Sequence, residues 1–240
     1  MSVMTDEAQE TRPALPKAPI LLAAATRWEA LPLARGLGLS PIGAFRFEGT
    51  LGGRRVVLVK TGMGAAKTAG VLGENFVAED FGLALSAGLC GALQPGLKTG
   101  DLVVDGAAVE LDYVAPLREA AESLGLRLHF GRLLHTNVVL APEAKLRLGA
   151  EQRAAACDME TAAVRRWAQA SLPVLGVRAV LDELRDELPE DAPEGEDAAA
   201  LARFALTHLG RIPGLVRTGL RCGRAMGNLT RLLKSYLEAL

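Results

Sequence analysis

Three carboxylates lie at points of this 240-residue chain where a strand of an α/β protein would give way to a turn or a helix. Glu29 follows the apolar run 20–25, and Asp182 follows the apolar run 174–181. Glu160 stands at the start of an amphipathic segment. Because α/β sheets bind ligands outside the carboxyl ends of their strands, these acids are candidates for a functional site. Each also has a structural interpretation, since acids are favoured in the first turn of a helix and aspartate is common in turns.

A glycine-containing turn is the second candidate. Gly62-Met63-Gly64 follows a predicted strand and precedes a predicted helix. Lys67 stands where a dinucleotide fingerprint needs its third glycine, and the phosphate-loop pattern does not fit either. Two interpretations therefore stay open: a tight turn that packs a helix onto the sheet, or backbone amides that line a ligand pocket at a helix N-terminus.

Continuous apolar runs bounded by turn residues predict buried strands, and helical periodicity predicts helices between them. The predicted strands are residues 20–25, 55–60, 83–87, 102–104 and 174–181, with further extended segments at 128–134 and 138–140. The predicted helices are residues 28–37, 65–78, 113–124, 158–170 (with Asp158 as N-cap) and 197–209. This alternation predicts an α/β fold in which helices cover both faces of a sheet. We divide the chain into a disordered tail (1–18), one domain (19–210) and a basic amphipathic helical tail (211–240).

Composition excludes several classes of protein. A net charge of −1 excludes a strongly basic body that wraps nucleic acid by charge alone. Three widely spaced cysteines form no disulfide framework, and no Cys/His cluster indicates a metal. No stretch reaches the roughly 18–20 apolar residues that span a bilayer. These features predict a cytoplasmic protein without a metal or a nucleic-acid partner.

Six short blocks, in order, resemble the purine nucleoside phosphorylase and methylthioadenosine/adenosylhomocysteine nucleosidase superfamily over residues 20–209. They are Ala24-Ala25-Thr26-Arg27-Trp28-Glu29, Thr61-Gly62-Met63-Gly64, Ser86-Ala87-Gly88-Leu89-Cys90-Gly91-Ala92-Leu93, Gly100-Asp101-Leu102-Val103-Val104, Asp158-Met159-Glu160-Thr161-Ala162-Ala163 and Val177-Arg178-Ala179-Val180-Leu181-Asp182. The resemblance implies a single domain with a central mixed β-sheet flanked by helices, and a homo-oligomer. It implies cleavage of the N-glycosidic bond of a purine nucleoside without a cofactor, with inorganic phosphate as co-substrate if the enzyme is a phosphorylase.

The resemblance also implies roles for individual residues. Asp182 would protonate the departing purine at N7, and Glu29 would activate water. Met159 and Glu160 would hold the ribose. The remaining candidates are a substrate pocket of Val139, Leu140, Gly88 and Cys90, and a phosphate or water site of Arg27, Gly64 and Ser86.

These residue types suit that chemistry. A proton given to the base makes it a better leaving group, and general acid catalysis is worth about 10²–10⁴ in rate. Asp182 must then be protonated when it acts, which requires a partly desolvated site. Glu160, beside the sugar, would stabilise an oxocarbenium-like transition state electrostatically.

The sequence departs from the pattern of the phosphate-using members. They often carry an arginine near Ser86 and a serine near Leu89, so the strong phosphate clamp looks absent or relocated. Arg27 could supply a guanidinium from the first loop. A Glu29 carboxylate would instead repel a phosphate dianion, which favours hydrolysis slightly over phosphorolysis and leaves both open.

The last thirty residues carry six Lys/Arg against the single acid Glu238. In a helical projection the apolar side chains fall mostly on one side and the arginines on the other. Such a helix is typical of a membrane-surface element, and equally of a helix that packs on its own domain or across a dimer. Together, this tail and the sequence block 88–93 resemble the hopanoid-associated phosphorylases. The resemblance implies release of adenine from adenosylhopane at the inner face of the membrane.

Two rival functions stay open. One is a futalosine hydrolase or methylthioadenosine/adenosylhomocysteine nucleosidase with a soluble substrate. The other is a non-catalytic nucleotide-binding or membrane-scaffold protein that kept the fold. The presence of all three carboxylates argues against the second rival, because a decayed site has no reason to keep them.

Overall fold

A computed structural model describes residues 18–106, 111–187 and 212–240. Its centre is a mixed sheet with the strand order β2-β3-β4-β1-β5-β10-β6-β7, and β9 joins β8 to β5. The pairs β4–β1, β1–β5, β5–β10 and β6–β7 are parallel, while β2–β3, β3–β4 and β10–β6 are antiparallel. The strands are β1 (Ile20–Ala24), β2 (Ser40–Pro41), β3 (Arg46–Leu51), β4 (Arg54–Lys60), β5 (Leu83–Ala92), β6 (Leu102–Asp105), β7 (Leu128–Phe130), β8 (Leu133–His135), β9 (Ala156–Asp158) and β10 (Val174–Asp182). The predicted single α/β domain with a mixed sheet is confirmed.

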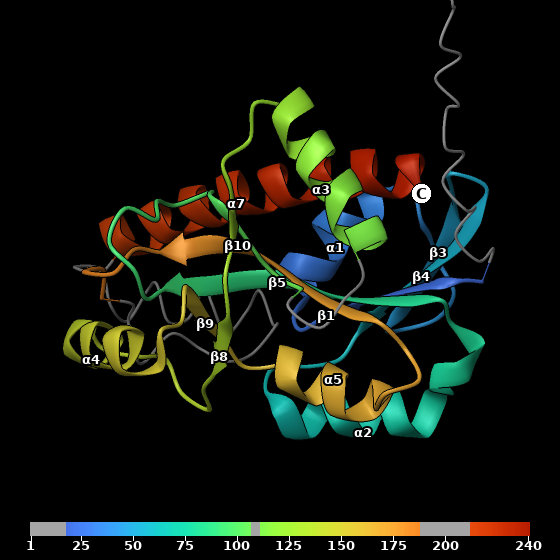
Figure 1. Ribbon diagram of the computed structural model, residues 1–240, viewed down its shortest axis with the longest axis horizontal. Helices are drawn as coiled ribbons and strands as arrows, with labels where there is room; N and C mark the ends of the chain where they lie inside the picture. The colour runs from blue at the N-terminus through green and yellow to red at the C-terminus, as the bar shows by residue number, and fades with distance from the viewer. Residues whose placement is uncertain (1–17, 107–110, 188–211) are drawn as a thin grey trace, which may run out of the picture.

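Helices cover both faces of this sheet (Figure 1). One face carries α1 (Arg27–Gly36), α3 (Leu111–Ser123) and α7 (Ile212–Ala239), and the other carries α2 (Ala65–Asn75) and α5 (Thr161–Ala168). A short 3₁₀ helix η1 (Ala78–Asp80) precedes β5, and α4 (Pro142–Gln152) lies beside β8 and β9. The central strands are continuous apolar runs because both of their faces are buried, as in β1, where all five residues are buried.

Several predicted boundaries were wrong. Helix α5 begins at Thr161, because residues 156–158 pair with β5 and β8 as strand β9. Glu160 is therefore the N-cap, although Asp158 Oδ2 still accepts the Thr161 N–H at 2.9 Å. Strand β5 continues to Ala92 because its last residues pair with β9. Residues 138–140 are not a strand, and α4 was not predicted.

Three further predictions cannot be compared with the structure. The disordered tail lies outside the described residues except for its last residue, and the predicted helix 197–209 lies wholly outside them. Residues 183–197, which the sequence predicts as a loop because they carry eight acids and two prolines, are described only as far as residue 187.

The second half of α7 packs on its own domain. Met226, Leu229, Leu233, Tyr236 and Leu237 are each at most 2% exposed and belong to the main hydrophobic core. In this second half of α7 the predicted apolar side is therefore part of the core. No helix in the part of the chain that the structure describes has the length and apolar character to cross a bilayer.

Leu233→Ala tests this packing. We expect the free energy of unfolding to fall by about 2–5 kcal/mol, because the truncation removes buried methyl groups and leaves a cavity. Denaturant unfolding would measure the loss. The matched control is Leu220→Ala, on the same helix at 72% exposure, which should change stability little. Equal stability of the two variants would contradict the core position of α7.

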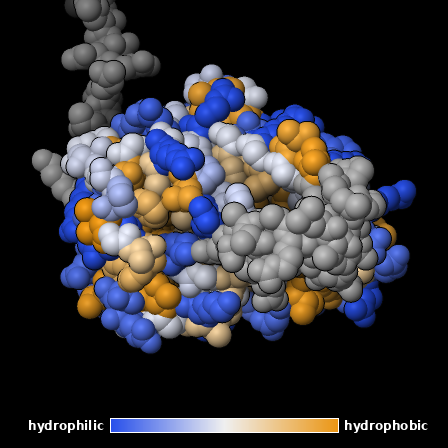
Figure 2. All heavy atoms as spheres, turned by 180° about the vertical axis from the view of Figure 1, so that it is seen from behind, coloured by the Kyte–Doolittle hydropathy of each residue, from blue (hydrophilic) through white to orange (hydrophobic). Residues whose placement is uncertain are grey.

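The first half of α7 is different. Val216 and Leu220 are 56% and 72% exposed, and Arg217 and Arg224 are exposed beside them. On the face seen in Figure 2, hydrophilic and hydrophobic residues are interspersed. The basic character of the predicted tail is therefore concentrated in this exposed half and on the outer side of the helix.

Candidate active site

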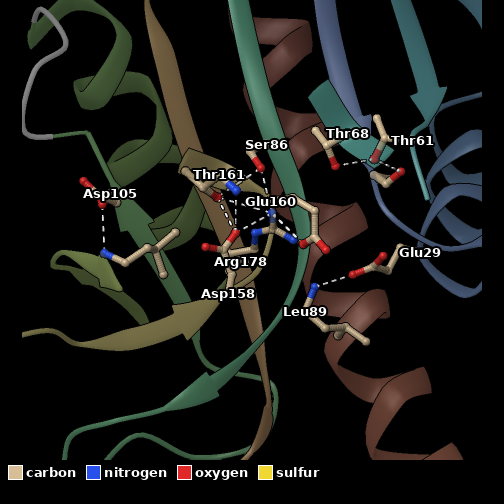
Figure 3. A network of polar contacts seen from close by, with 12 residues as sticks. Glu29, Thr61, Thr68, Ser86, Leu89, Asp105, Asp158, Glu160, Thr161 and Arg178 are labelled. Carbon is tan, nitrogen blue, oxygen red and sulfur yellow. Dashed lines mark hydrogen bonds and ion pairs between the residues drawn. The ribbon is translucent and has the colours of Figure 1, made fainter. Parts of the chain in front are cut away.

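Arg178 is the centre of a buried polar network, shown in Figure 3. Its side chain is 1% exposed, and its Nη2 donates to Ser86 Oγ at 2.7 Å and to Thr161 Oγ1 at 3.2 Å. The same nitrogen lies 2.6 Å from Asp158 Oδ2 and 3.5 Å from Glu160 Oε2. The two carboxylates raise the pKa of Arg178 against the opposing effect of burial. A permanent buried cation thus holds residues from β5, β9, β10 and the start of α5 together.

Sequence reasoning assigned no role to Arg178. The available signal was a single arginine in the middle of the apolar run 174–181. A buried charge without partners is costly, so an arginine in a central strand indicates that carboxylates from elsewhere in the chain meet it there.

Glu29 lies in the first turn of α1 and is 5% exposed. Its Oε2 accepts hydrogen bonds from the N–H of Thr26 at 2.9 Å and from Thr26 Oγ1 at 3.1 Å, which is a capping box. Its Oε1 accepts the N–H of Leu89 at 2.8 Å. The structural interpretation of Glu29 therefore holds, and the same contacts fix one oxygen over strand β5.

Gly88 has no side chain, and Glu29 and Arg178 approach its backbone closely. It stands opposite Arg178 in the β5–β10 register. A Cβ at this position would collide with Glu29 Oε1 and would lie 2.6 Å from Arg178 Nη1. Nη1 and Nε of Arg178 are buried without a hydrogen-bond partner among the described residues. An open donor and a carboxylate oxygen thus converge over a residue that has no side chain.

Glu160 and Gly64 are in direct contact next to this position. The N–H of Gly64 donates to Glu160 Oε1 at 2.8 Å. Gly64 has φ +92°, a conformation that favours glycine, and it caps α2. The nearest atom to a Cβ built on Gly64 would be Met159 Cε, at 4.0 Å. Burial raises the pKa of Glu160, and Arg178 and the Gly64 amide oppose part of that rise. The structure places Gly64 beside Met159 and Glu160.

Asp182 ends β10, where the register with β5 shifts. It is 5% exposed and pairs with the ammonium of Lys145 from α4. Burial raises the pKa of Asp182 above its ordinary value, and Lys145 opposes only part of the rise. Because a strand rises about 3.3 Å per residue, the Cα atoms of Arg178 and Asp182 are at most roughly 13 Å apart. Lys145 was missed by sequence reasoning because α4 was not predicted.

Two predicted phosphate ligands are placed elsewhere. Ser86 is fully buried, and its hydroxyl accepts hydrogen bonds from Arg178 and from Thr161 Oγ1 at 3.0 Å. Arg27 is exposed, and its guanidinium lies 5.7 Å from the ring centroid of Trp28. Ser86 thus contacts Arg178 inside the buried network, whereas Arg27 lies outside it, and a phosphate or water site at these residues stays a prediction.

The predicted pocket residues are only partly brought together. Cys90 is a core residue, 5% exposed, and burial raises its pKa well above the ordinary value. Val139 is 55% exposed, and Leu140 packs against a small apolar cluster that includes Cys157. Cys157 lies close to Asp182, since a Cβ on Gly91 would be 3.2 Å from its sulfur and 3.0 Å from Asp182 Oδ2. Leu140 is therefore near the Asp182 side of the site, and the roles of Cys90 and Val139 in binding substrate stay predictions.

Comparison with known proteins agrees with this fold. The sequence profile of the phosphorylase superfamily matches residues 20–120 and 107–211. No protein of curated function gives a significant sequence match. Two Helicobacter pylori structures are similar over 93% of the chain. They are a futalosine hydrolase mutant (TM-score 0.67, 18% identity, all of that chain covered) and a 5′-methylthioadenosine/S-adenosylhomocysteine nucleosidase mutant with 5′-methylthioadenosine in its active site (TM-score 0.69, 17% identity, 99% covered).

A third structure, the corresponding nucleosidase from Streptococcus pneumoniae with a transition-state inhibitor, has a TM-score of 0.64 and 20% identity. The alignment covers 92% of the present chain and 99% of that chain. At these identities the structural similarity shows the fold. The profile match spans more than half of the sequence. The chain therefore belongs to the phosphorylase superfamily and is an enzyme that cleaves glycosyl bonds.

Proposed function

We propose that this enzyme hydrolyses the N-glycosidic bond of a purine nucleoside. The observation that carries the proposal is the convergence of Glu29 Oε1 and Arg178 Nη1 beside Gly88. A water molecule there can accept a hydrogen bond from the guanidinium and donate one to the carboxylate. That is the arrangement a general base needs to take a proton from its nucleophile.

The reaction balances with the residues present. The C1′–N9 bond breaks with its electrons moving to the base, and Asp182 gives its proton to N7. The water oxygen bonds to C1′, and its proton passes to Glu29. Glu160 accepts hydrogen bonds from the sugar hydroxyls and its charge stabilises the cationic sugar in the transition state. The raised pKa of Asp182 supports its part, because a general acid must hold its proton before it acts.

Charge favours water over phosphate. Phosphate is an anion at neutral pH, and in this position it would lie against the Glu29 carboxylate. The Ser86 hydroxyl is occupied by Arg178 and Thr161. The similar structures named above are a hydrolase and nucleosidases, which agrees with this preference.

For the substrate we propose an adenine nucleoside with a lipid 5′-group, adenosylhopane. Support comes from the exposed half of α7, where Leu220 and Val216 lie beside Arg217 and Arg224. A cavity of about 700 Å³ is lined by this half of α7, by Glu183 and by residues 98–101 and 125–127. Its charged lining residues are Lys98, Arg127, Arg217, Arg221 and Arg224 against Asp101 and Glu183. A basic rim with exposed leucine suits an anionic lipid surface. A soluble substrate, methylthioadenosine or futalosine, is the second candidate, because similar structures act on or hold these compounds.

The test is product analysis with the full chain. Adenosylhopane, 5′-methylthioadenosine and futalosine are each incubated in ¹⁸O-labelled water with and without phosphate, and both products are identified by mass spectrometry. We expect adenine from adenosylhopane and a labelled free sugar. A phosphorylated sugar would overturn hydrolysis, and cleavage of a soluble nucleoside alone would overturn the lipid substrate. Intact protein that releases no base from any of them would leave the non-catalytic binding protein as the function.

The membrane contact has its own test. Arg217→Glu with Arg224→Glu should abolish most co-sedimentation with phosphatidylglycerol vesicles, since each basic residue near an anionic surface is worth about 1 kcal/mol. The matched control carries the same charge change on exposed residues of other helices, Arg147→Glu with Arg166→Glu. Equal binding by the two double variants would remove the support for a lipid substrate.

We also propose a homo-oligomer, supported by the exposed apolar side chains Trp28, Val138 and Val139.

A further inference from the structure

Lys145 is a fully buried cation whose partners all lie at the exit of β10. Its side chain is 1% exposed, and its Nζ donates to the main-chain oxygens of Asp186 at 2.8 Å and of Glu183 at 3.1 Å. Its third contact is the ion pair with Asp182 Oδ2. Burying an ammonium group is costly, and such a group is normally retained where its charge has a partner. The partner here is the acid that the proposed reaction needs.

The other titratable groups around Asp182 do not supply that charge. Cys157 from β9 is a neutral thiol, since burial raises its pKa to about 12. Cys90 from β5 is likewise held neutral by burial, which raises its pKa well above the ordinary value. Asp186 follows β10 and raises the pKa of Asp182, but it is itself paired with Arg221 of α7 at 2.6 Å. Among the described residues, Lys145 is the cation in direct contact with Asp182.

We propose that Lys145 is the positioning residue for proton transfer by Asp182: it holds Oδ2 and stabilises the carboxylate that forms when the Asp182 proton passes to the purine. This inference rests on the proposed function. The proton moves from Asp182 to N7 as the C1′–N9 electrons move to the base. The carboxylate left behind is paired with the ammonium, and Lys145 itself gives up no proton.

Two opposing requirements explain why a cation belongs here. Burial favours the protonated carboxyl, so Asp182 holds its proton, but it also makes Asp182 a weaker acid. A cation on one oxygen lowers the energy of the carboxylate and so strengthens the acid without exposing it to water. Removing the cation should therefore leave Asp182 protonated to a higher pH while it transfers the proton more slowly.

The experiment compares Lys145→Gln and Lys145→Arg with Arg147→Gln, which removes an exposed cation from the same helix. The substrate is the adenine nucleoside that the parent enzyme cleaves fastest. We expect kcat of Lys145→Gln to fall at least about tenfold, within the range that general acid catalysis contributes. The basic limb of its kcat/KM profile should move to higher pH. Lys145→Arg keeps the charge, so the basic limb of its pH profile should lie at the same pH as in the parent. Arg147→Gln should have the kcat and the pH profile of the parent.

A second substrate separates proton transfer from structure. 4-Nitrophenyl β-D-ribofuranoside has a leaving group that needs no proton, so the Lys145→Gln loss should be absent on it. If the glutamine variant does not fold, the same comparison is made with Lys145→Met, which also removes the charge and suits a buried position better. Equal losses on both substrates with an unmoved pH limb would overturn the inference and make Lys145 a structural brace. If the parent enzyme cleaves no nucleoside, the proposed function is overturned, and this inference with it. If the parent is active and Lys145→Gln has the kcat and the pH profile of the parent, this inference alone is overturned.

Discussion

Asp182→Asn should lower kcat for purine release by about 10²–10⁴, the range that general acid catalysis contributes. Asparagine keeps the shape of the side chain but has no acidic proton to give to N7. The substrate should still bind, so KM should change less than kcat. Steady-state adenine release and the circular dichroism of the variant would measure the two effects.

The neighbouring acid provides the control. Glu183 is partly exposed and pairs with Lys98 at 2.9 Å. Glu183→Gln changes the same kind of group one residue away, and it should retain the activity of the parent. If Asp182→Asn is as active as the parent, Asp182 is not the proton donor.

Arg178→Lys should lower kcat by about 10²–10³, the cost of removing one preorganised donor from a transition state. A lysine keeps the charge, but it cannot bind Ser86, Thr161 and the carboxylates and still present a nitrogen over Gly88. Arg178→Met should in addition lower the free energy of unfolding by about 3–5 kcal/mol, because Asp158 and Glu160 would remain buried without their cation. Kinetics and denaturant unfolding would measure the two changes separately.

Arg165→Lys is the matched control for this prediction. Arg165 pairs with Asp105 at 2.9 Å but is 36% exposed and lies outside the Arg178 network. We expect its activity to be close to that of the parent. If Arg178→Lys and Arg165→Lys behave alike, the unpartnered guanidinium nitrogens of Arg178 have no part in the reaction.

The three carboxylates could be found from the sequence because their positions depend on local order along the chain. Each follows a strand or begins a helix, and strand ends in an α/β fold meet at one edge. The partners of these acids could not be found in this way. Glu29 meets Leu89, Glu160 meets Gly64 and Asp182 meets Lys145, and these pairs are brought together only by the sheet order.

The C-terminal helix shows a different limit. An amphipathic pattern of leucines and arginines is the same whether the apolar side enters a membrane or a protein core. For the second half of α7, the structure distinguishes the two cases, because Leu229, Leu233 and Leu237 pack in the protein core. The register of β9 was also beyond prediction, since a three-residue strand has too few residues for a periodic signal.

The long α7 helix has a consequence for how the enzyme is assembled. It contacts β5 and β10, the strands that carry Gly88 and Arg178, and its buried residues complete the core on that side of the sheet. The hydrogen bonds of the site join residues 60, 92 and 96 positions apart, so loop closure must precede them. Such non-local contacts form slowly. Recovery of activity during refolding should therefore lag behind recovery of helical signal, and a chain still emerging from the ribosome cannot act before α7 has docked.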